Sequence, residues 1–128
     1  MSFVMEFDAK NNVLRGTLRG RVTDQILLDY YAAAVRFATS HPPCRSLWYF
    51  SEVTEFEVSS ECIRQVARKT PIAAGYMRVI VASPDFLFGM MRMAQILSES
   101  RPELHVVRTM DEAYRLLQVE SPEFSPVS

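Results

Sequence analysis

Hydrophobic and polar positions alternate at the start of the chain, and this pattern predicts a β-hairpin. Residues 3–8 place every second side chain on an apolar face, and residues 13–22 resume the alternation after an asparagine-containing turn over 9–12. Apolar positions then recur at helical spacing over 24–39, where Thr23 is a suitable N-cap. This part of the chain is therefore expected to form two antiparallel strands followed by a helix.

Short apolar runs alternate with helical patterns along the rest of the chain, and the runs fit strands that are buried on both faces. The predicted strands are 47–50, 77–82 and 104–107, and the predicted helices begin after Ser59 or Ser60, run over about 84–98, and begin after Thr109. Residues 51–58 are expected to form an acidic link. Residues 119–128 contain prolines and no periodicity, so they are expected to form an irregular tail.

These elements follow the order β-β-α-β-α-β-α-β-α, which predicts an α/β fold. Strands that alternate with helices pair in parallel as a rule, and the first hairpin adds one antiparallel pair. We therefore expect a mixed, mostly parallel sheet of about five strands with helices packed on it. A chain of 128 residues has the length of one domain, so we expect a single domain over 1–118 followed by the tail 119–128.

Net charge and hydropathy indicate which classes of partner are not expected for this chain. With a net charge of −1 there is no basic field to hold a polyanion, so we expect no nucleic-acid partner. No apolar run approaches the roughly 18–20 residues of a membrane span, and the first residues do not have the pattern of a signal peptide. We therefore expect no membrane insertion and a cytoplasmic location, where Cys44 and Cys62 stay reduced.

Two stretches resemble small bacterial SpoIIAA-like proteins, which belong to the STAS domain family. In the first, a strand leads into the helix Phe-Gly-Met-Met-Arg-Met at residues 88–93. In the second, a later strand leads into a capped helix that begins Asp-Glu-Ala at residue 111. The resemblance covers residues 1–118. It implies the STAS fold, which is related to the CRAL-TRIO/SEC14-like lipid-binding fold.

The resemblance also implies a switch position. In phosphorylated STAS antagonists a serine opens the second helix in the context Phe-x-Asp-Ser-Ser-Gly, and the matching stretch here is Phe-Glu-Val-Ser-Ser-Glu at residues 56–61. Ser59 would occupy the phosphorylated position, with Ser60 beside it. Val58 and Glu61 depart from the pattern, because they replace its acid and its glycine. The other interpretation is that Ser59 or Ser60 is only the N-cap of the helix.

The predicted helix over 84–98 has an unusually wide apolar surface. Nine of the twelve residues 86–97 are apolar, whereas a helix that covers a sheet needs an apolar arc of little over about 100°. Part of the helix is therefore expected to face a protein interface, an apolar ligand pocket or neighbouring helices. The candidate contact residues are Phe86, Leu87, Phe88, Met90, Met91 and Met93. Gly89 is expected to allow close packing on a strand.

Other chemistry-bearing residues do not form a recognisable site. Arg15, Arg19 and Arg21 lie on or just past the second strand, and Glu6 and Asp8 on the neighbouring strand are expected to balance their charge. Histidines and cysteines lack metal-ligand spacing, and no nucleotide-binding or nucleophile motif occurs. We therefore predict no metal, no cofactor and no catalytic residue.

The sequence leads to one functional hypothesis with two alternatives. The leading hypothesis is a non-enzymatic regulatory or binding domain of the SpoIIAA-like type, acting through contact with a protein partner or by self-association into a homodimer. The first alternative is a carrier of a small apolar, lipid-like ligand in a SEC14-like pocket. The second is an enzyme whose catalytic residues come together only in the folded chain.

Overall fold

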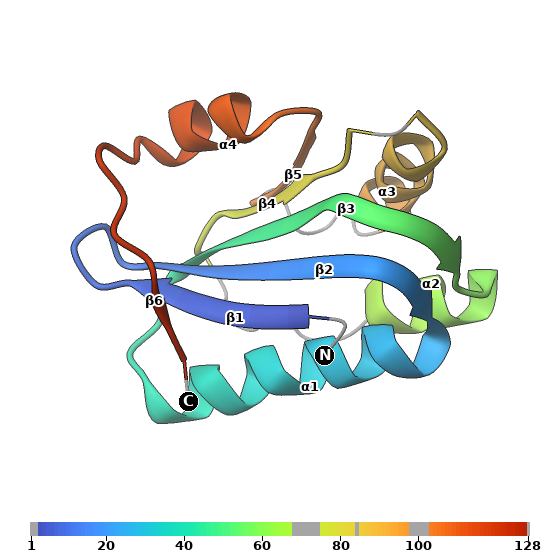
Figure 1. The fold of residues 1–128 in the computed structure, drawn as a ribbon, viewed down its shortest axis with the longest axis horizontal. Helices are drawn as coiled ribbons and strands as arrows, with labels where there is room; N and C mark the ends of the chain where they lie inside the picture. Colours follow the sequence, from blue (N-terminus) through green and yellow to red (C-terminus); the bar gives the residue numbers. More distant parts are fainter. Residues whose placement is uncertain (1–2, 68–74, 84, 98–102, 128) are drawn as a thin grey trace.

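The computed structural model describes residues 3–67, 75–83, 85–97 and 103–127. The described chain has an α/β fold, with a six-stranded mixed sheet and helices on both of its faces (Figure 1). The strands are β1 (Phe3–Asp8), β2 (Val13–Thr23), β3 (Arg45–Glu57), β4 (Arg78–Val81), β5 (Leu104–Val107) and β6 (Ser125–Pro126). The helices are α1 (Asp24–Ser40), α2 (Ser60–Ala67), α3 (Asp85–Leu97) and α4 (Met110–Leu117).

The sheet has the strand order β5-β4-β3-β2-β1-β6. β1 and β2 form the predicted antiparallel hairpin, in which Phe3 lies opposite Leu18 and Asp8 opposite Val13. β2, β3, β4 and β5 pair in parallel, as expected for strands joined through helices. The predicted α/β class and its mostly parallel sheet are therefore confirmed.

β3 is much longer than the predicted strand over 47–50. It continues to Glu57, so the segment expected to be an acidic link is largely strand. This half of β3 pairs with the end of β2, where Arg19 lies opposite Glu52 and Arg21 opposite Glu55. Acidic residues are depleted in strands, so local preference argued against the extension. Cross-strand charge pairs offset that preference here.

The C-terminal segment 119–128 contains a strand that the sequence pattern did not predict. β6 pairs antiparallel with β1 at the edge of the sheet, and Val127 donates its N–H to the carbonyl of Met5 at 3.0 Å. Phe124 lies under the guanidinium of Arg15, 4.0 Å from its ring centroid. The segment is therefore held on β1 and β2, and the sheet has six strands where five were expected.

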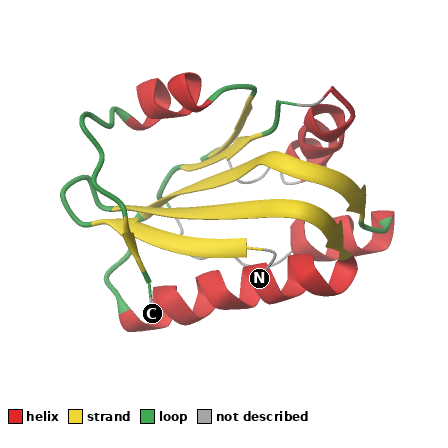
Figure 2. Ribbon diagram, viewed as in Figure 1, coloured by secondary structure: helices red, strands yellow, loops and turns green. Residues whose placement is uncertain are grey.

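The helices divide into two layers. Buried side chains of α1, α2 and α3 share one core with the sheet, and α4 forms a second, smaller core on the opposite face with Val13, Leu47 and Val79. Figure 2 shows α1 and α4 on opposite sides of the strands. α3 therefore packs with α1 and α2, and α4 alone covers the other face within the described chain.

Tyr30 of α1 lies at the centre of the larger core. Its side chain is fully buried and meets Trp48 and Phe50 edge-on, at centroid distances of 4.8 and 5.9 Å. Its hydroxyl rests on Gly16, where an added Cβ would lie 2.7 Å from Tyr30 Cζ. That hydroxyl has no hydrogen-bond partner within the described residues, and burial raises the pKa of Tyr30 well above its ordinary value.

The turn between β1 and β2 is organised by the buried carboxylate of Asp8. Asn11 donates its backbone N–H to Asp8 at 3.2 Å and its side-chain N–H at 2.6 Å. Burial alone would raise the pKa of Asp8, but hydrogen bonds from Asn11 and from the backbones of Glu123 and Lys10 outweigh it, so this pKa is lowered. Asp8 thus links the turn to the C-terminal segment.

We predict opposite stability effects for alanine at two glycines. Gly16→Ala should cost about 1–3 kcal/mol, because its Cβ would overlap the ring of Tyr30. Gly89→Ala should raise the free energy of unfolding by about 1 kcal/mol, since a Cβ there meets nothing within 4 Å and glycine weakens a helix. The expectation of close packing at Gly89 was wrong, because the residue is exposed. Urea unfolding of both variants measures the two effects.

A second prediction concerns acid stability. Because the pKa of Asp8 is lower in the folded chain than the ordinary 3.8, its ionised form stabilises the fold at neutral pH, and this contribution is lost as the pH falls through the folded value. Asn11→Ala should destabilise the fold by about 1–2 kcal/mol at pH 7, with a smaller difference in acid. Urea unfolding at several pH values tests this, and Asn12→Gly serves as the control. A pH-independent cost of Asn11→Ala would contradict the account.

Candidate functional site

Three N-caps of the described helices gather at the edge of the sheet where the parallel strands end. Thr23 accepts a hydrogen bond from the N–H of Ile26 at 3.4 Å, at the start of α1. Thr109 accepts one from the N–H of Glu112 at 3.2 Å, at the start of α4. Ser59, the candidate switch residue, occupies the corresponding position before α2 at the end of β3. The edge therefore carries the positive ends of several helix dipoles.

The hydroxyl of Ser59 makes two hydrogen bonds. It accepts the N–H of Cys62 at 3.1 Å, which caps α2, and it donates its own proton to Asp24 Oδ2 at 2.8 Å. The backbone N–H of Ser59 donates to Asp24 Oδ1 at 2.7 Å. The carboxylate of Asp24, the first residue of α1, therefore holds the start of α2 through two hydrogen bonds.

This arrangement determines what a phosphoryl group on Ser59 would do. The modified oxygen has no proton to donate, and the phosphate would bring about −1.5 to −2 charges beside the carboxylate of Asp24. Two unit charges 4 Å apart repel by about 4 kcal/mol at the effective dielectric near a protein surface. Phosphorylation at Ser59 would therefore separate the start of α2 from α1, although the helix dipole itself favours an anion.

Sequence reasoning missed Asp24 as the partner of Ser59. Val58, which stands where the STAS pattern has an acid, is buried in the core. The carboxylate beside Ser59 comes instead from a residue 35 positions earlier. Ser60 is exposed at the first position of α2, and Glu61 forms an ion pair with Arg64 at 3.0 Å. No local pattern reports a pair so far apart in the chain.

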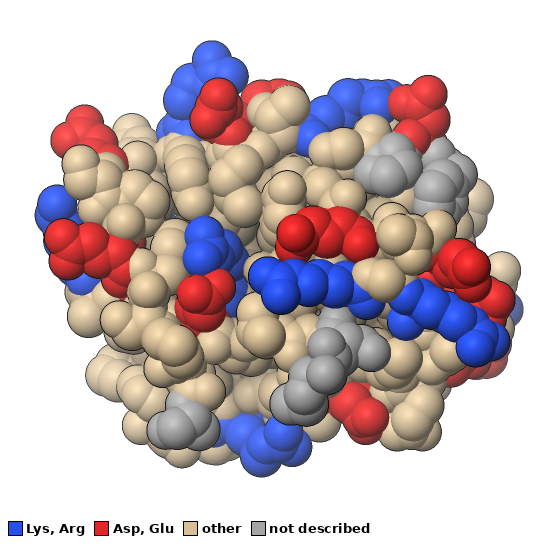
Figure 3. All heavy atoms as spheres, in the orientation of Figure 1, with Lys and Arg blue, Asp and Glu red and all other residues tan. Residues whose placement is uncertain are grey.

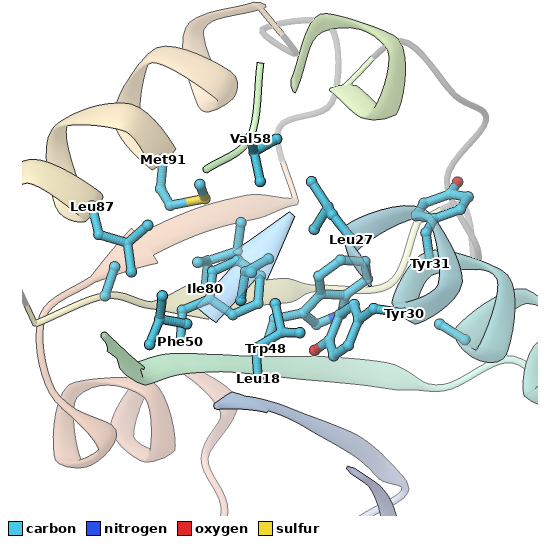
Figure 4. Packing of buried hydrophobic residues seen from close by; sticks show 14 of the residues in the cluster. Leu18, Leu27, Tyr30, Tyr31, Trp48, Phe50, Val58, Ile80, Leu87 and Met91 are labelled. Carbon is cyan, nitrogen blue, oxygen red and sulfur yellow. The ribbon is translucent and has the colours of Figure 1, made fainter. Parts of the chain in front are cut away.

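The apolar surface of α3 divides into a buried part and an exposed part. Leu87 and Met91 are 0% and 5% exposed and point into the core toward Ile80 (Figure 4). They do not belong to an exposed contact face, contrary to the sequence-based expectation, because they fill the space between α3 and the sheet. Met90 is half-buried and packs against the same core.

Phe88 is half-buried beneath an arginine. The guanidinium of Arg108 lies 4.0 Å from its ring centroid and also forms an ion pair with Asp85 at 2.6 Å. Arg108 follows β5, so this contact fastens the start of α3 to the end of that strand. The side chain of Phe86 lies outside the described residues.

Met93 remains exposed, together with Ile96 one turn later. Their side chains are 63% and 64% exposed, which makes them the most exposed large apolar side chains in the described chain. Ile96 was not among the predicted contact residues, although its spacing of three from Met93 places both on one side of the helix. The two residues define what we call the α3 apolar pair.

The arginines of β2 are balanced by carboxylates. Arg15 pairs with Glu6 at 2.8 Å, as expected, and Arg19 pairs with Glu52 at 3.0 Å. Arg21 pairs with Glu57 at 2.7 Å. Acidic and basic side chains accordingly alternate over β2 and β3 (Figure 3). Each such exposed pair stabilises the fold only modestly, and together the pairs leave no concentrated positive patch on these strands.

His41 lies at the end of α1 and Cys44 lies just before β3, so both are at the opposite end of these elements from Ser59. His41 stacks on Phe37, and its ring nitrogen Nδ1 donates to the carbonyl of Phe37 at 3.1 Å. Burial raises the pKa of the Cys44 thiol, which disfavours the reactive thiolate. Among the described residues, no cluster of three or more potential ligands could hold a metal ion, and no helix is long and apolar enough to cross a bilayer.

We predict strong coupling between Ser59 and Asp24. Ser59→Ala and Asp24→Ala should each cost about 1 kcal/mol, and the double variant should cost less than their sum, because each single change already breaks the hydrogen bond between the Ser59 hydroxyl and the Asp24 carboxylate. Urea unfolding of the four proteins gives the coupling energy. Thr109→Ala is the matched control, since it removes a cap that Asp24 does not touch, and its effect should add to that of Asp24→Ala. Additive effects of Ser59→Ala and Asp24→Ala would contradict the proposed energetic coupling between Ser59 and Asp24.

Comparison with models of protein families, with curated proteins and with solved structures finds no match to this chain. The resemblance to SpoIIAA-like proteins therefore stays a prediction from the residues quoted above.

Proposed function

We propose that this chain is a non-enzymatic, cytoplasmic binding domain of the SpoIIAA-like type that acts through protein–protein contact. The observation that supports the proposal is the α3 apolar pair, Met93 and Ile96, with more than three-fifths of each side chain exposed. Burying a side chain of this size is worth about 1.5–3 kcal/mol, so a partner that covers both gains substantially. Methionine also adapts its shape to the surface that it meets.

A second copy of this chain is the partner that we propose. A two-fold axis brings the same patch of both copies together, so a compact apolar pair on one helix can cover its own counterpart. The net charge of −1 adds only weak repulsion between copies. Contact with a different protein is the outcome to consider if the chain does not associate with itself.

Two observations favour binding over catalysis. The hydroxyl of Ser59 donates to a carboxylate and accepts a backbone N–H, so both of its roles are occupied by structural contacts. His41, one of two histidines, is held against Phe37 near the far end of α1. A nucleophilic serine is commonly activated by a histidine within hydrogen-bond reach, and His41 lies at the opposite end of α1 from Asp24, the partner of Ser59.

The carrier alternative gains no support from α3. A carrier needs an enclosed apolar cavity, and Leu87 and Met91 fill the side of α3 that faces the sheet. Polar groups, Asp24 and Arg108, lie near the starts of α2 and α3 and hold these helices to their neighbours. We therefore retain protein contact as the function.

Substitutions at two methionines of α3 test the proposal. Met93→Asp should leave the free energy of unfolding within about 0.5 kcal/mol of wild type, because the side chain is exposed, but should weaken dimerisation at least about tenfold. Met91→Asp should unfold the domain, because it places an unpaired charge in the core. Light scattering over a concentration series measures association, and urea unfolding measures stability.

Leu116→Asp is the matched control for Met93→Asp. Leu116 is also an exposed apolar residue, 40% exposed, but lies on α4 on the other face of the sheet. The control should dimerise like wild type. A wild-type chain that stays monomeric up to millimolar concentration would overturn the proposed dimer. A folded Met93→Asp variant that dimerises normally would overturn the assignment of the interface to α3.

A further inference from the structure

A groove lies at the end of the molecule opposite to Ser59, where α1 ends. It is a hollow of about 570 Å³ between β1, the second half of α1 and the C-terminal segment. A second hollow of about 460 Å³ adjoins it and shares Phe37, His41, Pro126 and Val127. The volumes lie within the range of about 300–1,000 Å³ that is usual for small-molecule sites.

One wall of the larger hollow is apolar. Phe3, Val4 and Met5 contribute from β1, Phe37 from α1 and Val127 from the segment after β6. Within the described chain, β6 pairs with Glu6 and Phe7, and Val127 bonds to Met5, so the outer edge of β1 at Phe3 and Val4 extends beyond this part of the C-terminal segment. Val4 is 37% exposed there. The wall therefore offers apolar surface that the described chain does not bury completely.

The ionisable groups among the described lining residues of this hollow are basic. Arg36 and His41 line it, and no carboxylate is among its described lining residues. Arg36 forms no ion pair with a described carboxylate, unlike the arginines of β2. His41 donates its Nδ1 proton to Phe37, so its other ring nitrogen is left for a ligand. The acidic residues Asp8 and Glu123 line only the adjoining hollow.

We propose that this groove binds a small amphipathic anion, namely a free carboxylic acid with an aliphatic or aromatic body. The carboxylate pairs with the guanidinium of Arg36, and the body lies along Phe3, Met5 and Val127. The last carbonyls of α1 carry partial negative charge and oppose the anion, so binding depends on Arg36. This site is separate from the α3 apolar pair and does not rest on the proposed dimer.

Octanoate and octan-1-ol, which share a chain length and differ in charge, test the proposal by calorimetric titration. Octanoate should bind more tightly to the wild-type chain. Arg36→Gln should weaken octanoate about tenfold and leave octan-1-ol unchanged, since it removes the charge but keeps a polar side chain. Arg92→Gln, which changes an exposed arginine of α3, is the matched control and should alter neither affinity.

Filling the groove provides an independent measurement. Ala33→Trp places a large ring in the hollow and should weaken both ligands, and Val4→Trp does the same from a more exposed position on β1 if the first variant is unstable. Equal affinity for the two ligands, octanoate binding that Arg36→Gln does not change, or no binding at millimolar concentration would each overturn the assignment. If Met93→Asp loses dimerisation but still binds octanoate, the groove and the proposed interface are independent sites.

Discussion

The parallel pairing of β2 with β3 gives the two ends of this molecule different surroundings. Because β2 to β5 run in the same direction, the helices that follow them begin at one edge of the sheet. The positive ends of the helix dipoles, the N-caps and the hydrogen bonds between Asp24 and Ser59 lie at that edge. The end of α1 and the amino ends of the strands lie at the other edge, where the groove forms. Both candidate sites thus depend on the direction of the strands.

The pairing of β2 with β3 also depends on the close packing of α1 against β2. Tyr30 is fully buried against Gly16, and no larger residue fits beneath it without displacing the ring. The hydroxyl of Tyr30 is thereby buried without a hydrogen-bond partner among the described residues. This lowers the stability of the fold unless packing around the ring offsets the loss. Trp48 and Phe50 supply that packing through edge-on contacts. The helix is positioned by aromatic packing, and its first residue, Asp24, is then held near Ser59.

α3 illustrates how one apolar pattern serves two purposes. Leu87 and Met91, four positions apart, face the sheet, while Met93 and Ile96 lie on the exposed side. The width of the apolar arc indicates that part of the helix faces something other than its sheet. It does not indicate which side chains do so, because the rotation of a helix is set by the strands and helices on which it packs. Of the residues singled out from the pattern whose side chains the structure describes, Met93 alone remains a strongly exposed candidate.

The sequence by itself determined the hairpin, the order of helices and strands, the N-caps Thr23 and Thr109 and the α/β class, because these depend on residue spacing within short segments. Only the tertiary structure decided the length of β3, the pairing of β6 with β1, the partner of Ser59 and the groove beside Arg36. Each of these joins segments that are far apart in the chain. Local propensity carries no information about such contacts, and it even disfavoured the acidic half of β3, which cross-strand arginines stabilise.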